Sequence, residues 1–123
     1  GLSYTNFEFS DLKTDKESYD PTDVIEVTFT LKNSGAVDGK EVTQLYISDP
    51  ESKVEKAAQE LKVFKKIFLK SGASENVTIL LPAKELAYYN EANKEWLVEP
   101  GTYNIKIGNS SRAIKAEVSI TLN

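Results

Sequence analysis

The 123 residues fit the usual size of one domain, so we expect residues 1–123 to form a single compact unit. Fifteen Lys and Arg against nineteen Asp and Glu give a formal net charge of −4, which would repel a phosphate backbone and predicts no nucleic-acid partner. No apolar run in the sequence approaches the roughly 20 residues of a membrane-spanning helix, so no membrane partner is expected either.

Two missing residue types exclude several kinds of chemistry. The chain has no His and no Cys, so it offers no Ser-His-Asp or Cys-His nucleophile, no Cys or His zinc site and no disulfide. We therefore expect no cofactor. The sequence also starts with Gly and contains no Met, which is typical of a fragment or a processed chain.

Seven runs of residues predict β-strands. Seventeen Val and Ile with nine Thr favour strands, because branching at Cβ packs well on a pleated surface. The runs cover residues 6–13, 24–32, 41–48, 61–69, 74–81, 102–108 and 114–122. Apolar and polar residues alternate most clearly in the second and the last run. Seven short strands in this length predict an all-β fold, a seven-stranded antiparallel two-sheet sandwich of the immunoglobulin-like kind.

Turn signals separate most of these runs. Asn33-Ser34-Gly35 and Asp38-Gly39 supply residues that tolerate a positive φ between the second and third predicted strands. Pro100-Gly101-Thr102-Tyr103 places a tyrosine just after a turn, as the tyrosine corner of Greek-key sandwiches requires.

Two longer segments interrupt the even spacing of the strands. Residues 50–60 are charged and are expected to form a solvated crossing loop. Residues 82–100 are too long for a bare connection, so we expect structure within them. Residues 82–86 predict a helical turn with Pro82 near its first position, and residues 95–98 predict a short extended piece.

Three aromatic residues in that second segment are the candidates for substrate binding: Tyr88, Tyr89 and Trp96. Aromatic rings stack on sugars, so these residues form the best candidate contact surface. The simpler interpretation, which we prefer here, is that they bury against the core or plug one open end of the sandwich.

Acidic residues suggest two further kinds of site. Asp15, Glu17, Asp20 and Asp23 lie within nine residues and would suit Ca²⁺, but their spacing matches no EF-hand loop and a turn is the preferred interpretation. We therefore expect no metal. A carboxylate pair is able to hydrolyse glycosides, yet most acids here fall on polar strand faces or in loops, so no catalytic residue is expected. Two glycosylation sequons, which begin at Asn76 and Asn109, receive no role.

Several strings together resemble the C-terminal fibronectin type III-like domain of many β-glucosidases and β-xylosidases of glycoside hydrolase family three. The strings are Gly1-Leu2-Ser3-Tyr4-Thr5 with Phe7, Asn33-Ser34-Gly35, residues 39–50, residues 60–72, Leu86-Ala87-Tyr88-Tyr89-Asn90, and Trp96 with Val98-Glu99-Pro100-Gly101-Thr102-Tyr103. The likeness spans nearly the whole chain. It departs from the family pattern at Val63, where Gly is usual, and after Pro50, where a Pro commonly precedes Glu60-Leu61.

The resemblance implies a non-catalytic structural accessory domain that packs on the catalytic domains of the same polypeptide. In the family the catalytic residues lie on other domains, so none is carried over to this chain. The alternatives are a carbohydrate-binding module that targets its enzyme to glucan, and an autonomous hydrolase. The implied parent enzyme hydrolyses terminal β-linked glucose or a related sugar. The lack of cysteine leaves the compartment of this enzyme open, because disulfide-free domains occur in oxidising and reducing surroundings alike. A periplasmic or secreted enzyme is compatible with the sequence.

Overall fold

The computed structural model describes residues 6–49, 60–110 and 113–123, and at residues 88–90 it describes the backbone. These residues form ten strands and one 3-10 helix. In chain order they are β1 (Phe7–Thr14), β2 (Ser18–Tyr19), β3 (Val24–Asn33), β4 (Gly39–Ser48), β5 (Glu60–Leu69), β6 (Ser74–Pro82), η1 (Ala83–Leu86), β7 (Tyr88–Asn90), β8 (Glu95–Leu97), β9 (Gly101–Ser110) and β10 (Ala113–Leu122).

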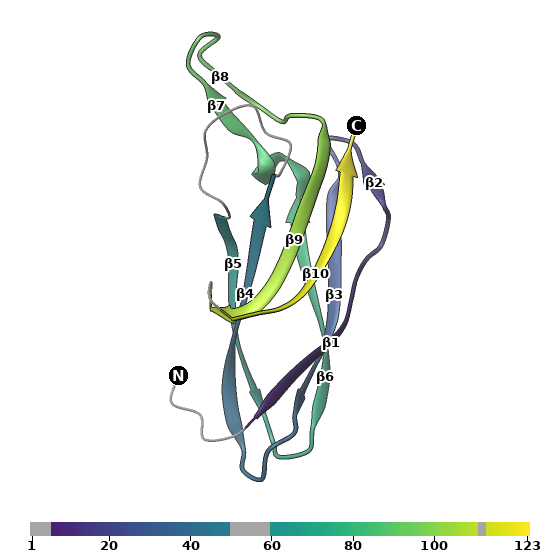
Figure 1. Cartoon of the computed structure of the whole chain (residues 1–123), viewed down its shortest axis with the longest axis vertical. Helices are drawn as coiled ribbons and strands as arrows, with labels where there is room; N and C mark the ends of the chain where they lie inside the picture. Colours follow the sequence, from purple (N-terminus) through teal and green to yellow (C-terminus); the bar gives the residue numbers. More distant parts are fainter. Residues whose placement is uncertain (1–5, 50–59, 111–112) are drawn as a thin grey trace.

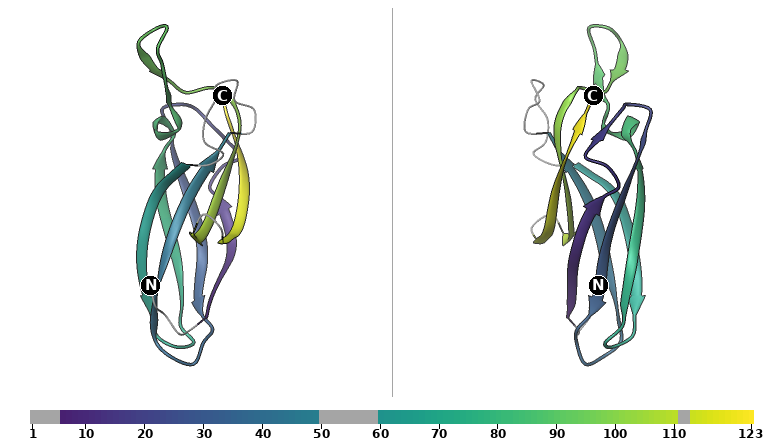
Figure 2. Two further views of the ribbon diagram at one scale, coloured as in Figure 1. Left: turned by 60° about the vertical axis from the view of Figure 1, so that its left-hand side comes forward. Right: turned by 90° about the vertical axis from the view of Figure 1, so that its right-hand side faces the viewer.

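The strands build two facing sheets (Figures 1 and 2). One sheet has the order β1-β3-β6 and the other β2-β10-β9-β4-β5, while β7 and β8 pair only with each other. The predicted two-sheet sandwich is confirmed, and the seven predicted strands are the seven long ones, but the two sheets hold eight strands because β2 joins the second sheet. The sequence missed β2 and β7 as strands, because two or three residues carry too little alternation to predict them. The prediction of purely antiparallel pairing was also wrong at one place, since β2 runs parallel to β10.

The core lies between the two sheets and consists mainly of aliphatic side chains. Along β3, Ile25, Val27 and Leu31 are completely buried, while Glu26 and Lys32 on the other face are exposed. A strand with this alternation covers one face with core and leaves the other to solvent, as its sequence predicted. Each fully buried Ile, Leu or Val contributes about 1.5–3 kcal/mol through the apolar surface that it removes from water.

The tyrosine corner is confirmed. Tyr103 at the start of β9 is 1% exposed, and its hydroxyl donates a 2.6 Å hydrogen bond to the carbonyl of Glu99. Gly101, two residues earlier, takes a φ of 140°, which L side chains rarely adopt. The turn at Gly101 therefore sets the entry of β9, and the tyrosine ties that entry to the preceding loop.

The residues between β6 and β9 hold the structure that their length predicted. The 3-10 helix η1 follows Pro82 as its N-cap residue and buries Ala83 and Leu86, so the predicted helical turn is confirmed. The expected extended piece at 95–98 corresponds to β8. The loop predicted at residues 50–60 falls almost wholly outside the described residues. Within the part of the chain that the structure covers, no helix is long and apolar enough to cross a membrane.

The turn after β3 does not use the positive φ values that its sequence allows. The positive φ angles of the described residues occur at Asp11, Lys94, Gly72 and Gly101. Asn33 instead ends β3 as a completely buried residue, and its side chain bonds to the backbone of Gly35 and Val37 within the turn. Asn33 therefore closes this turn by hydrogen bonding rather than by an unusual backbone conformation.

One buried hydroxyl on β4 has no partner, which leads to a prediction. Thr43 is completely buried, and its Oγ1 makes no hydrogen bond. Because an unsatisfied buried hydroxyl costs free energy, we expect Thr43→Val to raise the free energy of unfolding by about 1 kcal/mol. Urea denaturation of wild type and variant measures this difference. A loss of stability after this nearly isosteric change would mean that the hydroxyl is bonded in solution.

Candidate interaction surfaces

The β7–β8 hairpin extends beyond the end of the sandwich (Figure 1). Tyr89 and Trp96 are directly opposite each other in its register. Trp96 is 69% exposed, so the preferred interpretation, burial against the core, was wrong for this residue. The physical reason is its place in the fold, since the hairpin lies past both sheets. The side chains of Tyr88 and Tyr89 lie outside what the structure describes, so their assignment stays a prediction.

A second apolar surface lies on β5, the edge strand of the five-stranded sheet. Leu61, Phe64 and Phe68 are 48%, 55% and 54% exposed. Phe64 pairs with Gln44 and Leu61 with Tyr46, and residues opposite each other on paired strands share a face. The Tyr46 hydroxyl donates a hydrogen bond to the Gln44 side chain, which places these two residues on one face as well. We call this surface, formed by Tyr46, Leu61, Phe64 and Phe68, the β5 face.

An irregularity in β5 brings Leu61 onto this face. Val63 pairs with Leu45 and Leu61 with Tyr46, so Lys62 is an extra residue in β5. Without such a β-bulge, strict alternation would place Leu61 on the same side as Val63, toward the core. Val63, one of the two departures from the family pattern, is partly buried and packs against the core. The structure thus places Val63 within β5, beside this bulge.

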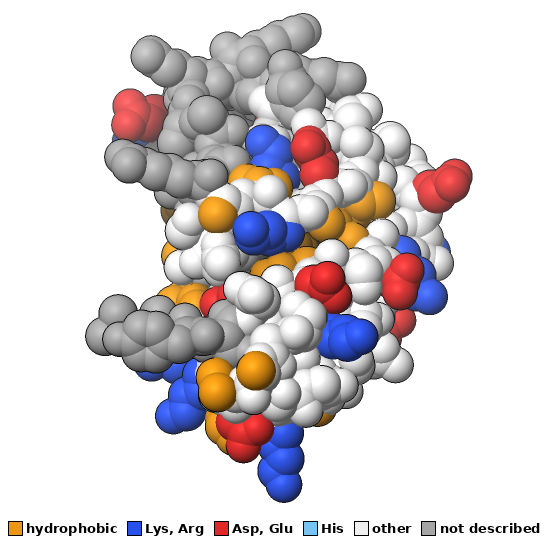
Figure 3. All heavy atoms as spheres, turned by 60° about the horizontal axis from the view of Figure 1, so that its bottom comes forward, with side chains coloured by type: hydrophobic (Ala, Val, Ile, Leu, Met, Phe, Trp, Pro, Cys, Tyr) orange, Lys and Arg blue, Asp and Glu red, His pale blue; other side chains and the backbone are white. Residues whose placement is uncertain are grey.

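Sequence reasoning missed the β5 face, although a signal was present. The strand predicted at residues 61–69 has apolar residues at both odd and even positions, unlike the clean alternation of residues 24–32. A strand with apolar residues on both faces is typical of strands that are buried on both sides. Elsewhere too, a space-filling view toward the lower end of the sandwich shows groups of hydrophobic side chains among Lys, Arg, Asp and Glu side chains (Figure 3).

The acidic run at residues 15–23 forms a hydrogen-bonded turn before β3. The buried Tyr19 donates a 2.6 Å hydrogen bond from its hydroxyl to Asp15 Oδ1, which also accepts one from the Glu26 amide at 3.1 Å. Asp23 Oδ2 accepts a hydrogen bond from the Asp20 amide at 2.8 Å and lies 3.4 Å from Lys16 Nζ. These contacts support the preferred interpretation as a turn. Among the described residues no group of three or more His, Cys, Asp and Glu gathers as a metal site.

These contacts shift three pKa values. The hydrogen bond from Tyr19 and then the one from the Glu26 amide lower the pKa of Asp15. Burial, and then the hydrogen bond to Asp15, raise the pKa of Tyr19. The Asp20 amide and the charge of Lys16 lower the pKa of Asp23. Each shift has a structural cause within this turn.

The raised pKa of Tyr19 predicts that the domain loses stability in alkali. Above about pH 10 the unfolded chain releases the tyrosine proton while the folded chain keeps it, so the free energy of unfolding falls as pH rises. The contribution of Asp15 has the opposite dependence, because it is present above about pH 4 and is lost as pH falls through the lowered folded pKa. We expect Tyr19→Phe to lower the free energy of unfolding by about 1 kcal/mol at neutral pH. We also expect this variant to lose less stability than the wild type as the pH rises above about 10.

Urea midpoints measured between pH 3 and pH 11 test this dependence. Asp15→Asn serves as the second variant, because it removes the carboxylate and keeps an acceptor for the tyrosine hydroxyl. The prediction would be contradicted if the urea midpoints of wild type and Tyr19→Phe fell equally steeply as the pH rises above about 10.

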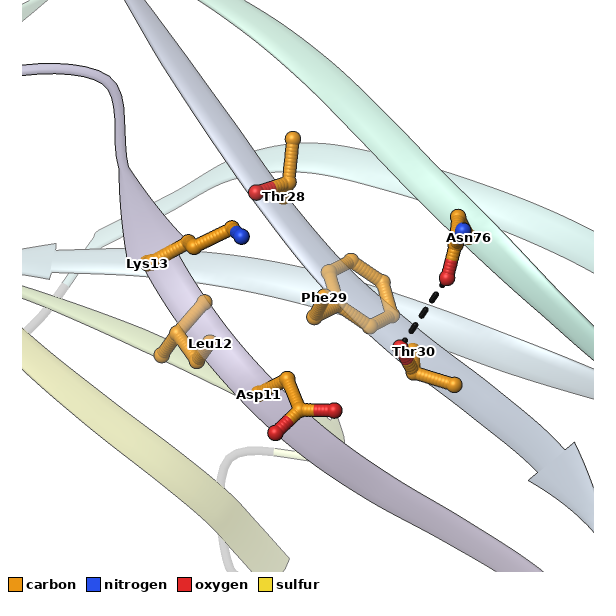
Figure 4. Close-up of a pocket in the computed structure, with 7 residues that line it drawn as sticks. All are labelled: Asp11, Leu12, Lys13, Thr28, Phe29, Thr30 and Asn76. Atoms are coloured by element: carbon orange, nitrogen blue, oxygen red, sulfur yellow. Dashed lines mark hydrogen bonds between the residues drawn. The ribbon is translucent and has the colours of Figure 1, made fainter.

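An open hollow lies on the outer side of the three-stranded sheet (Figure 4). It forms where β1 bulges, since Ser10 pairs with Thr30 but Lys13 pairs with Thr28. Asp11 in this bulge has a φ of 56°, a conformation that Asp tolerates better than most residues. Asn76, which begins one of the sequons, accepts a 3.1 Å hydrogen bond from Thr30 Oγ1 there. We assign no ligand to this hollow.

The arrangement of strands, the aliphatic core and the tyrosine corner define an immunoglobulin-like β-sandwich. Residues 41–111 match the family model of the fibronectin type III-like domain, and the chain belongs to this family.

Three similar proteins are glycosidases that are much longer than this chain. Thermostable beta-glucosidase B of Acetivibrio thermocellus is 44% identical over 123 residues, which are 100% of this chain and 16% of that protein. An exo-alpha-(1->6)-L-arabinopyranosidase of Bifidobacterium breve is 38% identical over 99% of this chain and 16% of its own length. The crystal structure of a Bifidobacterium adolescentis beta-glucosidase of glycoside hydrolase family three has a TM-score of 0.90 at 36% identity and covers 99% of this chain and 18% of that one.

The chain therefore spans about a sixth of the length of the curated relatives that it matches. It corresponds to the fibronectin type III-like segment of such enzymes, and their catalytic domain lies elsewhere in the polypeptide. The resemblance drawn from the sequence is thereby confirmed.

Proposed function

We propose that residues 1–123 form one fibronectin type III-like domain that packs on the catalytic domains of a β-glucosidase-like enzyme and stabilises them. The observation that carries this proposal is the β5 face, on which Leu61, Phe64 and Phe68 are each about half exposed. Clustered exposed apolar side chains of this size are typical of surfaces that another domain covers. The chain matches only 16% of the length of one such enzyme, so the several hundred other residues of that enzyme are available to cover the β5 face.

A structural role also fits the titratable groups. The described residues with shifted pKa values, Asp15, Tyr19 and Asp23, belong to the turn before β3 and are held by its own hydrogen bonds. Catalytic acids instead occupy pockets where their proton reaches a substrate. The proposal therefore assigns catalysis to other domains of the polypeptide.

Deletion of residues 1–123 from the full-length polypeptide tests the accessory role. We expect a lower melting temperature and a parallel loss of activity on an aryl β-glucoside, because the catalytic domains lose the surface that the domain covers. The control is the full-length polypeptide with the single substitution Lys32→Ala, which replaces an exposed residue and keeps the domain. Unchanged stability and activity after the deletion would contradict the proposal, as would turnover of the glycoside by residues 1–123 alone.

The exposed Trp96 favours a second candidate function, glucan binding. An indole that is 69% exposed on a projecting hairpin offers a flat face for a sugar ring. Affinity electrophoresis in gels with soluble β-glucan compares Trp96→Ala with Leu80→Ala, which removes a side chain of similar exposure from another surface. Retardation that Trp96→Ala alone abolishes would establish carbohydrate binding. Equal mobility with and without glucan for the unaltered protein would exclude this function.

A further inference from the structure

We propose that the β5 face docks against an apolar surface with carboxylates at its edge, located on the rest of the same polypeptide. This inference rests on the proposed accessory function and names the docking surface and the chemistry of its partner.

The apolar part of the β5 face has the size of a functional patch. Leu61, Phe64 and Phe68 are each about half exposed. A large apolar side chain covers roughly 150–250 Å² when fully buried, so the three together present about 300 Å². Tyr46, 7% exposed, pairs with Leu61 at one end of this face, and its hydroxyl donates a hydrogen bond to Gln44, the partner of Phe64. Patches of roughly 300–600 Å² on a single domain are often interaction sites.

The charge on this face is opposite in sign to that of the whole chain. Lys40 pairs with Phe68 and Lys66 with Val42, and the alternation of the strands puts both lysines on the β5 face side. The two acids of β4 and β5 are Glu41, which pairs with the buried Ile67, and Glu60, which pairs with the buried Ile47, so the register puts both on the opposite side of the sheet. Within the described part of the chain, no ion pair joins Lys40 or Lys66 to an acid.

These lysines predict the charge that the partner surface carries. A chain of net charge −4 that gathers exposed lysines beside exposed phenylalanines suits a partner with carboxylates around an apolar centre. A second copy of the same face is disfavoured, since a two-fold dimer would bring Lys40 and Lys66 of one protomer against those of the other. Edge lysines also prevent aggregation of open sheets, but that role does not account for two exposed phenylalanines beside them.

The apolar contribution is tested in the full-length polypeptide by the double variant Phe64→Ser/Phe68→Ser. Its matched control is Val24→Ser/Leu80→Ser, which removes side chains of similar exposure from the outer face of the other sheet. We expect the first variant to lower the melting temperature by several degrees and to speed proteolysis between this domain and the rest. The control is expected to match the unaltered protein. Equal effects of the two variants would overturn the proposal.

The charge contribution is tested with Lys66→Glu against Lys32→Glu, an exposed lysine on the outer face of β3. We expect only Lys66→Glu to lower the melting temperature, and this difference is expected to shrink at 1 M salt because salt screens exposed charges. No difference between these variants at low salt would show that Lys66 serves only to protect the edge strand.

The outcomes separate this inference from the proposed function. If deletion of residues 1–123 destabilises the polypeptide and the β5 face variants do not, the accessory role stands and the docking surface is wrong. If neither deletion nor the variants have an effect, both proposals are wrong. Self-association of the unaltered protein in sedimentation velocity, lost in Phe64→Ser/Phe68→Ser, would identify a second copy as the occupant instead.

Discussion

Replacing Asn33 by Ala is expected to lower the free energy of unfolding by about 3 kcal/mol, since each buried backbone group left without a partner costs about 1–3 kcal/mol. The Asn33 side chain is completely buried. Its Nδ2 donates to the carbonyls of Val37 and Leu69 at 2.9 and 3.0 Å, and its Oδ1 accepts from the Gly35 amide at 3.0 Å. One side chain thus joins the β3–β4 turn to the end of β5.

The chemistry of Asn33 predicts a still larger effect for Asn33→Asp at neutral pH. A carboxylate has no proton to donate, so it would face the carbonyl oxygens of Val37 and Leu69 as a buried charge without a partner. Urea unfolding at pH 7 is expected to rank the variants with Asn33→Asp below Asn33→Ala.

The control for Asn33 is Asn76→Ala. Asn76 is exposed and bonds to Thr30, so its loss is expected to change the stability by less than about 0.5 kcal/mol. A comparable small change after Asn33→Ala would contradict the role assigned to Asn33.

The layered fold is predictable from local sequence because a buried strand leaves its mark on every second residue. Ile25, Val27 and Phe29 follow this period, and their strand lies where the sequence places it. Pro82 and Tyr103 are similarly local, since a proline suits the start of a helical turn and a tyrosine beside a turn finds a backbone carbonyl nearby. These features depend on neighbours within a few residues in the chain.

Other features depend on residues that are distant in the chain and could not be predicted from it. The sequence predicts Asn33 as a turn residue, but one of its hydrogen bonds goes to Leu69, 36 residues away. The extra residue Lys62 follows from the register between β4 and β5, which sequence alternation does not fix. The exposure of Trp96 follows from the position of its hairpin beyond the sheets. The candidate surfaces were therefore less predictable than the fold.

Gly108→Ala is the second change for which we expect a large effect, a loss of about 2–3 kcal/mol of stability by overpacking. A Cβ at position 108 would collide with the carbonyl oxygen of Ala113 and lie 3.0 Å from Ile114 Cα. These are backbone atoms of β10, which no side-chain rotation moves away. Gly108 also pairs with Gln44 of β4, so β9 is held from both sides and has little freedom to retreat.

Gly72 offers a matched comparison, because glycine is required there for a different reason. A Cβ at position 72 would meet no atom within 4 Å, but the backbone has a φ of +79°. Gly72→Ala is therefore expected to cost about 1 kcal/mol through backbone strain, and Gly72→Asn less, since Asn adopts positive φ more readily.

Asparagine separates the two causes. At Gly108 it brings the same clash with Ala113 as alanine does, so Gly108→Asn is expected to be at least as harmful as Gly108→Ala, whereas Gly72→Asn recovers part of the loss. Urea unfolding of the four variants gives this comparison, and amide hydrogen exchange in β9 and β10 locates the damage. If Asn rescued position 108 as well as position 72, backbone conformation rather than the close approach of β10 would explain the glycine.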